Sequence, residues 1–536
     1  MNNKTRKLAI TAITAAAATA ATALCATATL RAGPAAAGNP KSPNIILILI
    51  DDMGYGDIGP FGSVKNRTPN LDRMASEGLK LTSFYAAPVC TRSRAQFMTG
   101  CYAKRVSLGH GVLFPAGATG LSPKEHTVAE LLKAQGYATM AIGKWHLGDQ
   151  PAFLPTSHGF DSYFGLPYSN DMDRPANAGP KSTRPPLPLI RNDKPVEVIT
   201  PEKQNHIEER YTAAALQFIR EHANSAAAPI ENRVPSEARS LTSKIENPQP
   251  FFLYLAHTAV HVPIHPGPNF RGKSANGRYG DWVEEVDWST GQVLDTLKQL
   301  GIADNTLVIF TSDNGPWMTQ GADAGVATPL RGAKGGTYEG GMREPTIAWW
   351  PGKVPAGKTT DAITGNIDIL PTFVALAGGA VPADNKIDGV NILPILLGQA
   401  SESTRKVQYY FSVDNKHLEA VRVGPWKLAI AWQKEKTGKN SDAAVNAKEK
   451  SGAPFAPVLY NLETDIGERH DVAAAHPDIV QQLQAYVTAM DKDLGNKDPD
   501  GPGVRPPGRV PHPVGLWLPG QPPSKQTLAA HYDTED

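Results

Sequence analysis

Residues 44–50 read N-I-I-L-I-L-I, a continuous apolar run that constrains the fold of this chain more than any other stretch. Such a run, without polar alternation, is typical of a strand buried on both faces in a parallel sheet. A similar run, Asn305 to Phe310, occurs much later in the chain. The two runs predict an α/β fold with a large, mixed and mostly parallel sheet flanked by helices.

Both runs end in side chains that carry oxygen. Asp51-Asp52 follow the first run, and Asp313-Asn314 lie shortly after the second. Because open α/β sheets bind ligands at the carboxyl ends of their strands, we expect these side chains to share one edge of the sheet. Adjacent carboxylates repel each other unless a cation lies between them, and oxygen ligands suit calcium or magnesium. A simple turn before Gly54 is the alternative interpretation of Asp51-Asp52.

The size and charge of the chain exclude some classes of function. Its 536 residues suit one large domain and a smaller one. A formal net charge of +1 gives no electrostatic basis for binding nucleic acid. An α/β enzyme is therefore the expected class.

Residues 1–37 have the organisation of a signal peptide. Lys4, Arg6 and Lys7 precede an Ala- and Thr-rich apolar run, and Ala35 to Ala37 offer a cleavage site. We expect export, to the periplasm or by secretion. An uncleaved anchor is the alternative, but the run is weakly apolar for a stable membrane span.

The stretch from Pro88 to Gly100 contains a cysteine at the expected start of a helix. Ser93 is expected to be the N-cap, so that Cys90 and Arg94 lie near the positive end of the helix. Helix N–H groups and a guanidinium both suit a tetrahedral oxyanion such as sulfate or phosphate. A buried structural cysteine, or a disulfide with Cys101, are the alternatives.

Further cations and hydroxyl groups follow other expected strands. Lys144 and His146 come after the strand at Tyr137 to Ile142, and Ser169 and Lys334 lie in loops. His257, His261 and His265 have the spacing of one helical face, which would suit a metal. Pro263 and Pro266 forbid a regular helix there, so a zinc cluster is not expected.

The motifs together resemble the type I sulfatases of the alkaline phosphatase superfamily, and within them the arylsulfatase A-like branch. The matching stretches are I-D-D-M-G-Y-G-D (50–57), C-T-R-S-R-A-Q-F-M-T-G (90–100), G-Y-A-T-M-A-I-G-K-W-H-L-G (136–148), L-P-Y-S-N-D (166–171), A-V-H-V-P (259–263), S-D-N-G (312–315) and L-R-G-A-K-G-G-T-Y-E-G-G-M-R-E-P (330–345). The resemblance implies hydrolysis of sulfate monoesters of aryl or carbohydrate alcohols.

The resemblance also implies a cofactor, a modified residue and a set of site residues. Cys90 would be oxidised to Cα-formylglycine by a formylglycine-generating enzyme or its equivalent, and the aldehyde hydrate would be the nucleophile. One Ca²⁺ per chain would be held by Asp51, Asp52, residue 90, Asp313 and Asn314. Arg94 and Lys144 would hold and polarise the hydrate, His146 would be the base, and Ser169, His261 and Lys334 would bind the sulfate group, with His261 or Lys334 assisting the leaving oxygen.

Two residues depart from the family pattern: Cys101 stands where these sulfatases often carry Arg, and the other departure concerns maturation. The maturation signal is C-x-P-x-R, or Ala in the third position, and here that position is Arg92. If Cys90 is not converted, the chain would be a non-catalytic binder of sulfated glycans. A phosphate or phosphonate ester hydrolase of the same superfamily is a further alternative.

The expected domain layout follows from the resemblance together with the composition of the chain, which is rich in Ala, Ser, Pro and Asn without periodicity at 221–250. Residues 40–400 would form the catalytic domain, with an exposed insertion at 221–250. Residues 401–497 would form a smaller α+β domain with an antiparallel sheet, and 498–536 a Pro-rich tail.

Overall fold

The computed structural model describes residues 42–109, 111–172, 185–224, 249–414, 417–496 and 499–518. The expected signal peptide lies outside the described residues, as do residues 225–248 of the expected insertion and 519–536 of the tail. Within the described ranges, no helix combines the length and apolarity needed to cross a membrane.

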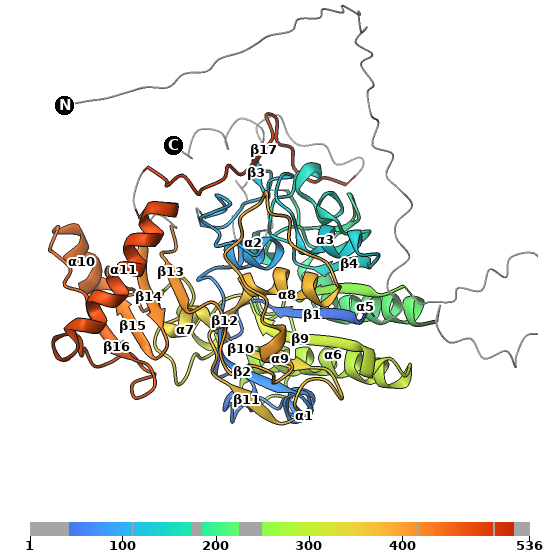
Figure 1. Ribbon diagram of the computed structural model, residues 1–536. Helices are drawn as coiled ribbons and strands as arrows, with labels where there is room; N and C mark the ends of the chain where they lie inside the picture. Colours follow the sequence, from blue (N-terminus) through green and yellow to red (C-terminus); the bar gives the residue numbers. More distant parts are fainter. Residues whose placement is uncertain are drawn as a thin grey trace, which may run out of the picture. The chain divides into compact units, whose positions relative to one another are not determined.

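An 11-stranded mixed sheet forms the centre of the fold (Figure 1). Its strands, in spatial order, are β11 (Lys358–Thr360), β2 (Leu79–Tyr85), β10 (Arg343–Trp349), β9 (Thr306–Ser312), β1 (Asn44–Ile50), β8 (Phe251–Ala256), β4 (Ala138–Gly143), β5 (Ser162–Gly165), β6 (Pro188–Arg191) and β7 (Lys194–Val198), with β12 (Thr364–Gly365) beside β2.

The central strands are parallel, as the apolar runs predict. β1 pairs in parallel with β8 and β9, with Ile45 opposite both Phe252 and Leu307. Beyond this block, β10 is antiparallel to β9 and β6 is antiparallel to β5. The expected mixed, mostly parallel sheet is therefore confirmed.

Helices cover both faces of this sheet. Alternate residues of β1 enter two cores: Leu47 and Leu49 pack on one face, and Ile46 and Ile48 on the other. The first face is covered by α2 (Cys90–Thr99), α3 (Val128–Ala134), α8 (Ile369–Leu376) and α9 (Leu393–Leu396). The second is covered by α1 (Pro69–Glu77), α5 (Ile207–Asn224) and α6 (Gly277–Gln299) (Figure 1). This two-sided burial explains why β1 carries no polar side chain after Asn44.

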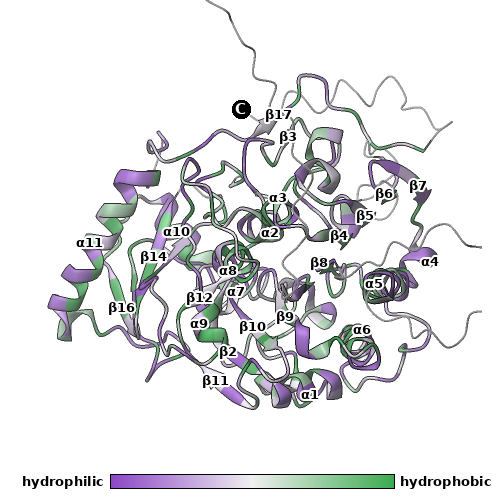
Figure 2. Cartoon of the chain, turned by 45° about the vertical axis from the view of Figure 1, so that its right-hand side comes forward, coloured by the Kyte–Doolittle hydropathy of each residue, from purple (hydrophilic) through white to green (hydrophobic). Residues whose placement is uncertain are grey.

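The C-terminal part contains the expected second sheet. It is antiparallel, in the order β13 (Val407–Phe411), β14 (Leu418–Val423), β15 (Trp426–Ala429) and β16 (Val458–Asn461). Helix α11 (Pro477–Leu494) packs on it through Leu483, Val487, Met490 and Leu494. Figure 2 shows both hydrophobic and hydrophilic colour along α11.

The remaining regular elements are short. They are α4 (Pro201–Gln204), α7 (Glu339–Met342), α10 (Ala443–Lys450), and the two-stranded pair of β3 (Thr119–Gly120) with β17 (Gly508–Arg509). The pair joins part of the Pro-rich tail to the segment before α3. The residue boundaries of the two expected domains stay predictions.

The start of α2 differs from the expectation. The helix begins at Cys90, with Val89 in the N-cap position, so Ser93 is not the cap. Ser93 Oγ instead accepts a hydrogen bond from Ala87 N at 2.7 Å and donates to Ala87 O at 3.2 Å. Ser93 therefore fastens the first turn of α2 to the segment before it.

Candidate active site

The sheet brings the sequence motifs together at one edge. Strands β9, β1, β8 and β4 are neighbours and run in the same direction, so the residues after each strand share the carboxyl edge. Asp51, Asp313 and Lys144 directly follow β1, β9 and β4. Gly143 ends β4 just before Lys144 and has φ +98°. Only glycine fits this position, because an added Cβ would lie 1.8 Å from Ala256 O.

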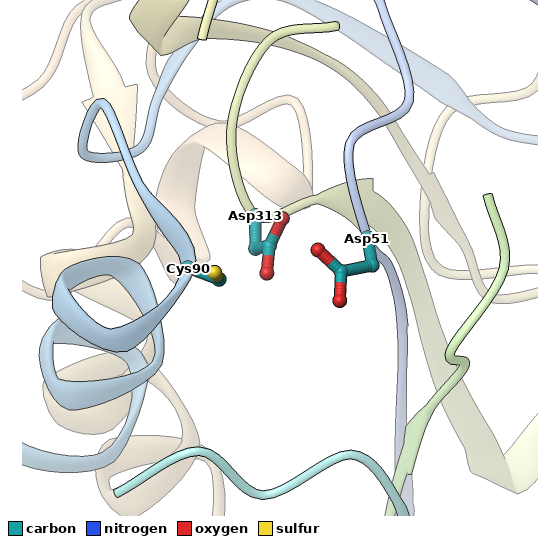
Figure 3. A group of neighbouring side chains, drawn as sticks. All are labelled: Asp51, Cys90 and Asp313. Atoms are coloured by element: carbon teal, nitrogen blue, oxygen red, sulfur yellow. The ribbon is translucent and has the colours of Figure 1, made fainter. Parts of the chain in front are cut away.

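Three buried groups face one another at this edge. Figure 3 shows Cys90 from α2 pointing toward the same space as Asp51 and Asp313. One ligand atom from each lies within 4.8 Å of the others, and the same holds for Asp51, Asp52 and His261. Asp52 has φ +61°, an unusual conformation for a residue with a side chain, and such strain is often found at functional sites.

Three cations neutralise the carboxylates. Arg94 donates from Nε at 3.0 Å and from Nη2 at 2.8 Å to Asp313 Oδ2. Lys144 Nζ donates to Asp51 Oδ2, and Lys334 Nζ lies 2.6 Å from Asp52 Oδ1. The site therefore balances three carboxylates with three cations, all of them almost fully buried.

Burial and the neighbouring charges shift the pKa values of Asp313 and Asp51 in opposite directions. Burial raises the pKa of Asp313 to about 6, and the negative charge of Asp51 adds to the increase. Burial also opposes ionisation of Asp51, but Lys144, His261 and Arg94 outweigh it and hold that pKa well below its usual range. Asp51 is therefore ionised at neutral pH.

Cys90 is a free thiol, buried at 2 % exposure. Burial raises its pKa, although Lys144 and Lys334 act in the opposite direction. Cys101 is also free, and its Sγ accepts a hydrogen bond from Arg505 Nη2 at 3.3 Å. The alternative of a disulfide between the two cysteines is therefore wrong.

His146 is held as a neutral imidazole. Its Nε2 donates to Leu113 O at 2.9 Å, and its Nδ1 has no hydrogen-bond partner within the described chain. Burial lowers the pKa of His146 well below its usual value, and the charges of Lys144 and Arg94 lower it further. The lone pair is consequently on Nδ1.

Ser169 and His261 join this group. Ser169 Oγ accepts a hydrogen bond from Lys144 Nζ at 3.2 Å and lies 3.4 Å from His261 Nδ1. His261 Nδ1 also lies 2.6 Å from Val262 O, and Nε2 is 3.7 Å from Asp52 Oδ2. The structure therefore brings together all the residues that the sequence singled out for the site.

The three histidines after β8 do not converge on a common point. His257 Nδ1 lies 2.5 Å from Glu208 Oε2, and His265 Nδ1 lies 3.0 Å from Asn205 Oδ1, while His261 reaches Asp52. Each of the three rings has its own partner.

Two residues near the site, Trp317 and Glu208, were not predicted from the sequence. Trp317 packs against His261, with ring centroids 5.4 Å apart, and the Lys334 ammonium lies 4.6 Å from the centroid of its indole ring. Glu208 accepts hydrogen bonds from the N–H groups of Thr258 and Ala259, just before His261. Trp317 follows the S-D-N-G motif closely, a signal that could have found it, whereas nothing local marks Glu208.

The donor atoms fit a hard divalent cation. Asp51 Oδ1 and Asn314 Oδ1 are buried, and neither has a hydrogen-bond partner among the described residues. Asn314 Nδ2 donates to Asp52 Oδ1 at 2.7 Å, which leaves the amide oxygen available for a ligand. Carboxylate and amide oxygens are the ligands that calcium prefers.

Comparison with known proteins agrees with this geometry. Residues 43–380 match the sulfatase family, and residues 403–500 match the C-terminal region of aryl-sulfatase. The chain is 37% identical over 476 residues to human arylsulfatase A, which covers 85% of this chain and 88% of the relative. It is 36% identical over 500 residues to canine N-acetylgalactosamine-6-sulfatase, covering 86% and 88% respectively.

Solved structures show the same relationship. A sulfatase from Pseudoalteromonas sp. superimposes with a TM-score of 0.71 at 28% identity, over 85% of this chain and 92% of that one. The matched regions contain the buried cage of Asp51, Asp52, Asp313 and Asn314, and the neighbouring Cys90. The chain belongs to the sulfatase family, whose members are sulfate ester hydrolases of the alkaline phosphatase superfamily.

Proposed function

We propose that this sulfatase uses Cα-formylglycine, made from Cys90, as its nucleophile. The observation that carries the proposal is the position of Cys90 Sγ within 4.8 Å of carboxylate oxygens of Asp51 and Asp313. A thiol suits soft metals, whereas these oxygens suit a hard one. Oxidation that replaces the sulfur by oxygen removes this mismatch.

The pKa of the thiol supports the same proposal. Because burial raises the pKa of Cys90, an unmodified thiol would be protonated at neutral pH and would be a weak nucleophile. Conversion requires a formylglycine-generating enzyme or its equivalent as a partner. Since Cys90 and Arg92 are both buried, at 2 % and 1 % exposure, conversion would precede folding.

A single Ca²⁺ would be held by Asp51, Asp52, Asp313, Asn314 and residue 90. When bound, it would stabilise negative charge on the sulfate oxygens. The unpartnered oxygens of Asp51 and Asn314 support this assignment.

The cations of the chain would bind and polarise the ester. Arg94 contacts Asp313 and Lys144 contacts Asp51, and both carboxylates lie next to residue 90. The two cations can therefore bind the oxygens of the modified residue 90. Lys334, His261 and Ser169 would bind the sulfate group. Lys334 or His261 would donate a proton to the leaving oxygen.

His146 would be the base. Its pKa lies well below its usual value, so the ring is neutral, and its proton is on Nε2, where Leu113 O accepts it. Nδ1 would then accept a proton from the group at position 90 and release sulfate.

The proposed substrates are aryl or carbohydrate sulfate monoesters. One structural relative, with a TM-score of 0.66 and 29% identity, was solved in complex with k-i-k-neocarrahexaose. We further propose that residues 1–37 direct export to the periplasm or beyond the cell, that residues 40–400 carry the chemistry, and that 401–497 form the C-terminal domain.

The test joins mass spectrometry with turnover. We expect the peptide containing residue 90, from the native host, to be lighter than the thiol form by about 18 Da, the change from thiol to aldehyde. We also expect release of sulfate from 4-nitrophenyl sulfate that stops on chelation and returns with Ca²⁺. An unmodified thiol in a protein without turnover would contradict the proposal and favour the non-catalytic binder.

A further inference from the structure

The indole of Trp317 covers two groups of the proposed sulfate site. The Lys334 ammonium lies 4.6 Å from the centroid of this ring, and the His261 ring lies 5.4 Å away at an angle of 54°. Both groups also face Asp52, at 2.6 Å and 3.7 Å. Trp317 thus lies directly beside the donors that an incoming anion must reach.

Backbone hydrogen bonds link the segments that carry Trp317 and Cys90 through the Lys334 loop. Lys334 N donates to Pro316 O at 3.1 Å, next to Trp317, and Gly335 N donates to Pro88 O at 2.8 Å, shortly before Cys90. The Lys334 loop is therefore bonded to both segments. The residues shortly before Trp317 and shortly before Cys90 are therefore bonded to adjacent residues of one loop.

Trp317 keeps accessible surface beside the groups that it contacts. The side chains of His261 and Lys334 are 4 % and 9 % exposed, and Trp317 is half-buried. Part of this aromatic residue is thus accessible next to the anion donors. In a sulfate monoester, the leaving group is attached to one oxygen of the sulfate, so it lies next to the groups that bind the sulfate.

We propose that Trp317 is a specificity-determining residue that stacks on the leaving group of the ester. The proposal rests on the proposed function of this site. The indole plane fits a ring with a flat apolar face, which is either the C–H face of a sugar or an aryl ring. Lys334 and His261 bind the sulfate, and Trp317 binds the ring that carries it.

Binding to an inactive protein tests the proposal without turnover. Dissociation constants for galactose 6-sulfate, 4-nitrophenyl sulfate and inorganic sulfate are measured by calorimetry on Cys90→Ala with and without Trp317→Ala. We expect Trp317→Ala to weaken binding of a ring-bearing ester by about 10-fold, the range of aromatic stacking, and inorganic sulfate by less than about twofold. Trp317→Phe should retain most of the affinity.

A second tryptophan supplies the matched control. Trp426 is also half-buried and packs on His476, with ring centroids 4.8 Å apart, but it lies in β15 of the C-terminal sheet. Trp426→Ala should leave all three dissociation constants unchanged.

Each result has a defined meaning. Weaker binding of the sugar sulfate alone, or of the aryl sulfate alone, supports stacking and identifies the ring. Equal weakening of inorganic sulfate, or no weakening of either ester, overturns the proposal. Absence of turnover in the wild-type protein is a separate result, which contradicts the proposed function and not the stacking.

Discussion

The guanidinium of Arg92 donates hydrogen bonds to the carbonyl oxygens of Ser412 and Gly109. Ser412 directly follows β13, so this side chain joins the first turn of α2, where Cys90 lies, to the C-terminal sheet. Arg92 is buried at 1 % exposure, and burial lowers its pKa to about 9. The residue that departs from the maturation signal is thus a structural link between two parts of the chain.

Replacing Arg92 should change the conversion of Cys90 and the stability of the fold in opposite directions. Arg92→Ala restores a residue of the family signal, so we expect a larger fraction of formylglycine at position 90, measured by peptide mass spectrometry. The loss of two donors to buried carbonyl oxygens should lower the free energy of unfolding by about 1–3 kcal/mol.

Arg92→Lys is the matched control for this prediction. It keeps a cation in the maturation signal but cannot reproduce both hydrogen bonds of the planar guanidinium. We expect lower stability without a gain in conversion. Equal conversion in the Ala, Lys and wild-type proteins would show that position 92 does not limit maturation.

The local patterns of the sequence predicted the sheet well, because hydrophobic periodicity and strand ends are short-range features. The run at 44–50 became β1 at those residues, and its parallel pairing placed Asp51 beside Asp313. The family resemblance supplied the roles of the site residues. Their detailed positions then followed from the common edge of the sheet.

Contacts between distant segments could not be predicted in this way. Arg92 bonds to Ser412 across 320 residues, and Glu208 bonds to Ala259 across 51. Neither contact has a periodic signature, since each depends on how finished elements pack. The expected cap at Ser93 was wrong for a different, local reason: Ser93 bonds to Ala87, and the helix begins earlier, at Cys90.

Calcium should stabilise the protein through Asn314. Its Oδ1 is buried and has no hydrogen-bond partner within the described ranges. Asn314→Leu removes this oxygen as a calcium ligand and replaces the side chain by one of similar size. We expect calorimetry to show calcium affinity at least about 10-fold lower, and the calcium-dependent rise in Tm to shrink accordingly.

Asn44→Leu is the control for the calcium prediction. Asn44 is also buried, but it begins β1, at the opposite end of the strand from Asp51, and donates to Thr306 Oγ1 at 3.2 Å. This variant should keep the calcium affinity of the wild-type protein. The same affinity in Asn314→Leu would remove Asn314 from the ligand set.

Glu208 should position the loop that carries His261. Its Oε1 accepts from Thr258 N at 3.0 Å and Ala259 N at 2.8 Å, and Ala259 O accepts from Asp51 N at 2.9 Å. Glu208→Gln keeps only one oxygen, so an amide N–H group faces either His257 Nδ1 or the backbone N–H groups of Thr258 and Ala259. We expect a loss of about 10-fold or more in kcat and about 2–3 kcal/mol in stability.

The neighbouring Glu209 provides the comparison for Glu208. It lies on the same helix, is 30 % exposed, and contacts Asn269 at the surface. Glu209→Gln should leave kcat and Tm nearly unchanged. A Glu208→Gln enzyme with wild-type kcat would show that the contacts of Glu208 with Thr258 and Ala259 have no influence on the site.

Glu285, which is not one of the proposed site residues, should make stability depend on pH. Burial raises its pKa to about 9, and the charges of Glu208 and Glu209 add to the increase. The folded state therefore holds a proton that the unfolded state loses near its ordinary pKa of 4.5. This contribution to stability is complete below about pH 4.5 and is lost as the pH rises toward 9, at about 1.4 kcal/mol per pH unit.

Glu285→Gln isolates this contribution, because glutamine stays neutral and can still accept the hydrogen bond from Gly267 N, which lies 2.7 Å from Glu285 Oε2. We expect denaturant unfolding at pH 5, 7 and 8.5 to show that the variant loses less stability than the wild-type protein as the pH rises. The exposed Glu221→Gln serves as the control. Parallel stability curves for wild type and Glu285→Gln would mean that Glu285 ionises alike in both states, and its burial would then need another compensating contact.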